Sequence, residues 1–168
     1  MTLLLYSGLL LLLLPVQTTL FEHLSLWGVK PDLCLVATCL TGFLGGRARG
    51  LWIGLGLGFV QDIFSAGGIG LNMITKGIAG VVSGAVVKIL SDTTPPAIFL
   101  PTLLLSFIFG LVSLISARPH VDWMFLIQDF RSILLPQAFF DAIMAVGFHW
   151  LIIKYLPQLS VLTPSSLR

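Results

Sequence analysis

Residues 42–84 constrain the fold more than any other stretch of the chain. They form two apolar, glycine-rich segments separated by the acid Asp62 and a short glycine hinge at 65–68. Five glycines on these segments recur at a spacing of four residues: Gly50, Gly54, Gly58, Gly80 and Gly84. On a helix such residues share one face, and in lipid small residues at this spacing let helices approach closely. We predict that the five glycines form a helix-packing or partner-binding face at the centre of a membrane bundle.

The composition of the whole chain supports a membrane setting. Its 168 residues are 57% hydrophobic and 10% charged, whereas soluble domains average about 45–50% apolar and about 25% charged residues. A soluble fold of this length could not bury so much apolar surface, so we expect the bilayer to be the solvent. The small net charge of +2 and the lack of a basic patch argue against a nucleic-acid partner.

The pattern of apolar runs and helix breakers predicts an all-α integral membrane protein. We expect one polytopic domain over residues 1–168, a compact bundle of about six transmembrane helices. The predicted spans are 3–21, 31–46, 50–64, 69–90, 97–117 and 133–156. The first run lacks a basic start and a cleavage site, so we interpret it as a retained span and not a signal peptide.

Two segments leave alternatives open. The span at 50–64 would be about 22 Å long against a hydrocarbon core of about 30 Å. It therefore thins the bilayer, has its end shielded by other helices, or is re-entrant. At 121–131, apolar residues recur at helical spacing with polar ones between them, which fits a short interfacial helix and an ordinary loop equally well.

The distribution of basic residues predicts the orientation. Six spans place both termini on one side, and the side richer in Lys and Arg faces the cytoplasm. With cytoplasmic termini the inner side holds Arg47, Arg49, Lys88, Lys154 and Arg168. The outer side then holds Lys30, Arg118 and Arg131. We therefore expect both termini to be cytoplasmic.

Four polar residues at or within the spans are candidates for a polar or ion-pair site, because buried charge is costly in a bilayer. Asp62 is expected to cap the N–H groups that open the next helix, with a partner contact or a polar site as the alternative. Lys76 shares a helix face with Asn72, and we expect it to pair with Asp141 of the last span. That pair either holds helices together or forms a site for a polar ligand or for protons.

Enzyme signatures are missing from the sequence. It has no G-x-S-x-G elbow, no H-E-x-x-H and no phosphate-binding loop. Cys34 and Cys39 have no metal-ligand spacing and are expected to be buried, inert thiols. His149 has no serine or cysteine companion and is expected to satisfy a local hydrogen bond. We predict no catalytic residue, no metal and no cofactor.

Three short motifs carry a resemblance to a known family. They are Pro31-Asp32-Leu33 at the start of the second span, Gly58-Phe59-x-x-Asp62 in the third, and Ile69-Gly70-Leu71 at the start of the fourth. In these motifs and in its length the chain resembles the bacterial rod shape-determining protein MreD family.

The resemblance implies a non-enzymatic component of the cell-wall elongation machinery, or rod complex, in the bacterial cytoplasmic membrane. Such a protein contributes to the regulation of rod cell shape by binding MreC. A RodA-type glycosyltransferase, a penicillin-binding transpeptidase and MreB are associated indirectly. The resemblance also implies a fold similar to the substrate-binding subunits of energy-coupling-factor transporters.

Two other functions are weighed against this one. The first is a small-molecule, vitamin-type substrate-binding subunit of a membrane transporter, which would have the same length and span count. That family tends to carry an A-x-x-x-A docking pattern in its first span, and residues 3–14 here lack it. The second, a membrane hydrolase or transferase, ranks last because His149 has no nucleophile beside it.

Overall fold

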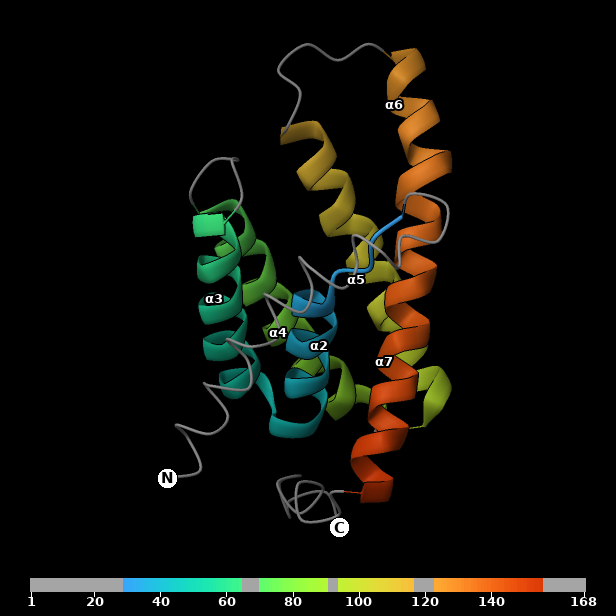
Figure 1. The fold of residues 1–168 in the computed structure, drawn as a ribbon. Coiled ribbons are helices and arrows are strands. Elements are labelled where there is room, and N and C mark those ends of the chain that lie inside the picture. Colours follow the sequence, from blue (N-terminus) through green and yellow to red (C-terminus); the bar gives the residue numbers. More distant parts are fainter. Residues whose placement is uncertain (1–28, 65–69, 91–93, 117–122, 156–168) are drawn as a thin grey trace.

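The computed structural model describes residues 29–64, 70–90, 94–116 and 123–155, and its regular elements are helices. Helix α3 (Arg47–Phe64) and helix α4 (Leu71–Leu90) form one antiparallel pair, and helix α5 (Pro95–Ser116) and helix α7 (Leu135–Tyr155) form another. Helix α2 (Leu33–Gly45) lies between the two pairs (Figure 1). The first predicted span, 3–21, lies outside the described residues, so the count of six spans stays a prediction.

Helix α2 is the buried centre of this arrangement. It packs against α3, α4, α5 and α7, and it has buried side chains on every side, among them Val36, Cys39 and Phe43. This explains why its sequence is apolar all round and not amphipathic. Its 13 residues make it about 20 Å long, shorter than the hydrocarbon core of about 30 Å. Figure 1 accordingly shows α2 beginning part way along the bundle and not at its end.

A single residue, Gly46, connects α2 to α3. Its φ of +82° is left-handed, a conformation that costs other L-residues about 1–2 kcal/mol. The N–H of Gly46 donates to the carbonyl of Gly42 at 2.9 Å and so satisfies the end of α2. This tight reversal places α3 directly alongside α2.

The α7 helix is preceded, without a break, by helix α6 (Trp123–Asp129) and a π-helical turn (Phe130–Leu134). Pro136 has no N–H to donate to the carbonyl of Ser132, so one helical hydrogen bond is missing there. The π-helical turn lies at this position in the helix. The segment 121–131, for which an interfacial helix and a loop were both open, therefore contains a helix that continues into α7 (Figure 1).

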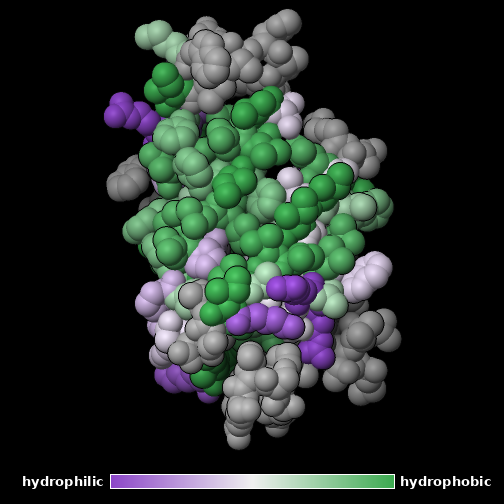
Figure 2. Space-filling model, turned by 180° about the vertical axis from the view of Figure 1, so that it is seen from behind, coloured by the Kyte–Doolittle hydropathy of each residue, from purple (hydrophilic) through white to green (hydrophobic). Residues whose placement is uncertain are grey.

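The outer surface of the bundle is apolar. Large hydrophobic side chains are exposed on every long helix except α2, for example Trp52 on α3, Ile74 on α4, Leu100 on α5 and Phe139 on α7. Figure 2 shows a broad hydrophobic surface, with most hydrophilic groups toward its lower end and a smaller cluster at its upper left edge. Within the described residues, three helical stretches are long and apolar enough to cross a membrane: Leu71–Ile89, Pro95–Ser116 and Ile127–Tyr155. The chain is therefore a membrane protein built as a helical bundle.

Candidate functional site

Asp62 caps the α3–α4 hairpin. Its side chain is 2% exposed, and one carboxylate oxygen accepts from the backbone N–H groups of Gly70 (2.8 Å) and Met73 (3.0 Å). The other oxygen accepts from the backbone N–H and the side-chain amide of Asn72, at 3.0 and 2.9 Å. The Asp62 carboxylate thus accepts hydrogen bonds from N–H groups at the start of α4 that have no partner within the helix. This is the capping arrangement predicted for Asp62 from the sequence.

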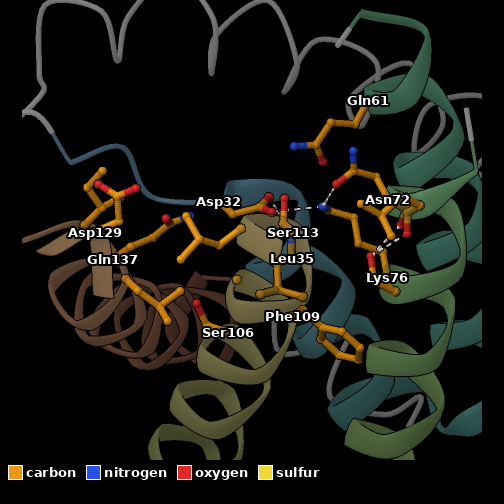
Figure 3. Close-up of a pocket in the computed structure, with 16 residues that line it drawn as sticks. Asp32, Leu35, Gln61, Asn72, Lys76, Ser106, Phe109, Ser113, Asp129 and Gln137 are labelled. Atoms are coloured by element: carbon orange, nitrogen blue, oxygen red, sulfur yellow. Dashed lines mark hydrogen bonds and ion pairs between the residues drawn. The ribbon is translucent and has the colours of Figure 1, made fainter. Parts of the chain in front are cut away.

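Lys76 is the next residue in the same network. Its side chain is 3% exposed, and its ammonium lies 2.9 Å from a carboxylate oxygen of Asp32 and 3.3 Å from the amide oxygen of Asn72 (Figure 3). Asn72 can serve both neighbours because its NH₂ faces the Asp62 carboxylate and its oxygen faces the ammonium. The expectation that Lys76 pairs with Asp141 is wrong, because Asp32 at the start of α2 is its ion-pair partner.

Asp32 both caps helix α2 and pairs with Lys76. It is the N-cap of α2, where one carboxylate oxygen accepts from the N–H of Leu35 at 3.0 Å while the other faces Lys76. Because α2 begins inside the bundle, its positive dipole end would otherwise lie unpaired at that depth. The Asp32 carboxylate stabilises this helix end, and Lys76 balances the charge that Asp32 brings.

Asp141 on α7 joins the network through the backbone of α2. It is fully buried, and its carboxylate accepts from the N–H of Asp32 at 2.8 Å and from the hydroxyl of Ser106 on α5 at 2.5 Å. We call the linked side chains the central polar network: Asp62, Asn72, Lys76, Asp32, Asp141 and Ser106. This network connects α3, α4, α2, α7 and α5, so it joins the central helix α2 to both helix pairs.

Sequence reasoning placed Asp62, Asn72, Lys76 and Asp141 in a polar site but did not include Asp32 or Ser106 in it. A signal for Asp32 was present, since an acid directly before a short apolar helix is a typical N-cap. No local pattern marks Ser106, which is an isolated hydroxyl in an apolar helix.

The predicted glycine face packs inside the bundle. A Cβ atom at Gly54 or Gly58 would collide with the backbone of Lys76 or Asn72 on α4, and one at Gly50 would collide with Gly80. At Gly84 it would collide with the backbone at Arg47. Gly42 on α2, which was not predicted as part of this face, approaches Gly80 in the same way. The backbones therefore pass so closely that only glycine fits.

A cavity of about 330 Å³ lies beside the central polar network. Its polar lining includes Asp32, Gln61, Asn72, Lys76, Asp129 and Gln137. Leu35 and Phe109 contribute apolar walls, and the exposed Ser113 lies at its edge. Figure 3 shows Gln61 reaching toward this space from α3, with Asp129 and Gln137 on the opposite side.

Two buried polar atoms have no hydrogen-bond partner among the described residues: Oε1 of Gln61 and Nε2 of His149. His149 is 4% exposed, and among the described residues its Nε2 does not make the local hydrogen bond expected for this side chain. Cys34 and Cys39 are both buried, as expected. Within the described ranges, no group of three or more His, Cys, Asp and Glu side chains could hold a metal ion.

A comparison with protein-family models gives a match to this chain. The matching family is described as rod shape-determining protein MreD, and the match covers residues 1–159. Searches of curated proteins and of solved structures each found no match.

Proposed function

The chain belongs to the rod shape-determining protein MreD family, and from this premise we propose that it is a non-enzymatic component of the bacterial cell-wall elongation machinery. It regulates rod shape by binding an MreC-like protein. Through that protein it is associated with a RodA-type glycosyltransferase, a penicillin-binding transpeptidase and, indirectly, MreB. Its place in the cell is the cytoplasmic membrane.

The observation that carries this proposal is that the central polar network is internally satisfied. Each of its three carboxylates accepts at least two hydrogen bonds or ion pairs from other residues of the chain. Charged groups arranged in this way hold helices in register. The remaining surface is mostly apolar helix faces, which are suited to contact with lipid and with the transmembrane helices of partners.

We also propose a membrane topology for the whole chain. Six spans, with the first at 3–21, would form one domain whose fold resembles the substrate-binding subunits of energy-coupling-factor transporters. The end of the bundle where α2 turns into α3 and where α4 and α7 end carries Arg47, Arg49, Lys88 and Lys154. By the positive-inside rule this end faces the cytoplasm, as do both termini.

A second candidate function is a small-molecule substrate-binding subunit of a transporter. The observation that favours it is the polar cavity of about 330 Å³, a size at the lower limit of known ligand sites, which span about 300–1,000 Å³. The missing A-x-x-x-A pattern in the first predicted span argues against it.

Affinity purification of the tagged chain from its native membrane, followed by mass spectrometry, separates the two functions. The proposal predicts recovery of an MreC-like protein together with wall-synthesis proteins. Recovery of ATP-binding cassette subunits and a membrane coupling subunit, without wall-synthesis proteins, would support the transporter function instead. A tagged, unrelated membrane protein of similar size is the control for non-specific recovery.

A further inference from the structure

The end of the bundle at which α2 turns into α3, and at which α4 and α7 end, is called here the basic end; it is the lower end in Figure 1. Four exposed bases lie there: Arg47, Arg49, Lys88 and Lys154. Within the described ranges none of the four forms an ion pair. Figure 2 shows most of the hydrophilic groups at this end, below the hydrophobic surface.

The positive sign of the basic end holds for every placement of the residues outside the described ranges. The described acids lie away from it: Asp32, Asp62 and Asp141 in the central polar network, and Asp129 at the end of α6. The chain has three other acids: Glu22, Asp92 and Asp122. Even if all three lay at the basic end, the four bases would outnumber them.

Three of the bases are brought together by the packing of α4 on the turn between α2 and α3. A Cβ atom at Gly84 would lie 2.8 Å from the Cα atom of Arg47. Lys88 follows Gly84 by one helical turn on the same face of α4, so it lies next to Arg47. A Cβ atom at Gly45 would lie 2.8 Å from Cδ of Arg49. The stem of Arg49 therefore lies back over the same turn.

Large apolar side chains are exposed beside these bases. Trp52, one helical turn after Arg49, is 72% exposed, and Ile89, next to Lys88, is 78% exposed. Tryptophan is enriched where headgroups meet acyl chains. A ligand that contacts the bases and these side chains together must join a negative group to an apolar chain. A soluble phosphate or an acidic protein segment would leave the apolar side chains uncovered, so the surface favours a phospholipid.

We propose that the basic end binds the phosphate group of an anionic phospholipid through Arg47, Arg49 and Lys88. Guanidinium groups match phosphate oxygens with paired N–H donors, and the ammonium adds a third charge. An acyl chain of the lipid then lies along Trp52. Lys154 is left out of the site because its ammonium lies over an aromatic ring, 4.6 Å from the ring centre. The inference goes beyond the proposed role in cell-wall elongation and does not rest on it.

Native mass spectrometry of the full chain in a neutral detergent tests this site. It compares dioleoylphosphatidylglycerol with dioleoylphosphatidylcholine, which has the same acyl chains but no net charge. Phosphatidylglycerol should bind more tightly by about tenfold or more, because each base near a membrane surface contributes about fivefold. Equal binding of the two lipids would overturn the proposal and leave the bases to an acidic partner protein.

Matched variants locate the binding. Arg47→Gln and Lys88→Gln should each weaken phosphatidylglycerol binding by about fivefold, whereas Arg47→Lys should keep most of it because the charge remains. Arg131→Gln is the control, since it removes the same charge at an exposed position of the π-helical turn, away from the basic end. Thermal unfolding in the same detergent checks that each variant is folded. Equal loss in Arg47→Gln and Arg131→Gln would contradict the site.

Glycerophosphoglycerol, the headgroup without acyl chains, distinguishes a lipid from a soluble phosphate. A phospholipid site predicts that this compound does not displace phosphatidylglycerol at equal concentration. Displacement would show that the phosphate alone is recognised and would overturn the assignment to a lipid. None of these results changes the proposed role in cell-wall elongation, because that role is tested by recovery of the partner protein.

Discussion

Replacing Gly54 by alanine tests the close approach of α3 and α4 most sharply. A Cβ atom at Gly54 would lie 2.7 Å from the carbonyl carbon of Lys76 and 2.9 Å from the side chain of Thr38. Non-bonded carbon atoms prefer about 3.5–4.0 Å. The two helices must therefore separate by about 1 Å, because the Lys76 atom belongs to the backbone and cannot rotate away.

The magnitude of the effect follows from two opposing terms. Overpacking a tight core costs about 1–3 kcal/mol, and a backbone collision belongs at the upper end of that range. Alanine gains about 1 kcal/mol over glycine in helix propensity. We therefore expect Gly54→Ala to lower the free energy of unfolding by about 2 kcal/mol.

Gly56 provides the matched control for this measurement. It lies on the same helix, but a Cβ atom there meets nothing within 4 Å. Gly56→Ala should therefore raise stability by about 0.5–1 kcal/mol. Thermal unfolding in one mild detergent, followed by tryptophan fluorescence, compares the two variants. Equal unfolding temperatures for the two would refute the close packing of α3 on α4.

Two further predictions concern Asp62 and the cysteines. Asp62→Asn should cost about 1.5–3 kcal/mol of stability, because the acceptor of the α4 N–H groups loses its charge and one of its acceptor oxygens. Asp129→Asn should cost less, because Asp129 is less buried than Asp62, and equal losses would argue against the cap. Cys34 and Cys39 should resist maleimide labelling until the protein unfolds, and rapid labelling of the folded protein would contradict their burial.

The class of fold and its glycine packing were accessible from the sequence because both are encoded locally. A strongly apolar composition leaves few alternatives to a membrane bundle. The spacing of Gly50, Gly54 and Gly58 defines one helix face whatever that face contacts. The cap by Asp62 was also predictable, since it acts across a hinge of a few residues.

The partner of Lys76 was not predictable, because it depends on where α2 begins in space. Depth in the membrane suggested Asp141, yet many residues share a depth, and the sequence does not say which helices are neighbours. Asp32 lies 44 positions before Lys76 in the sequence, so no local pattern connects the two residues. The cavity was not predicted for the same reason, since its lining comes from α2 and from both helix pairs.

The central claim is that the buried charges serve the fold and leave partner binding to other surfaces. Asp32→Asn or Lys76→Met alone should destabilise the protein by about 3–5 kcal/mol, since each leaves one buried charge unpaired. The double variant removes both charges, keeps an N-cap at position 32 and should recover most of that loss.

The most direct measurement is therefore the function of the Asp32→Asn, Lys76→Met double variant. It would be produced in a rod-shaped bacterium depleted of its own family member, with cell aspect ratio and recovery of the MreC-like protein as readouts. Our account predicts rod-shaped cells and recovery of the partner as with the unaltered chain. A double variant that is folded and membrane-inserted, yet gives round cells without partner recovery, would show that the charges themselves carry the function.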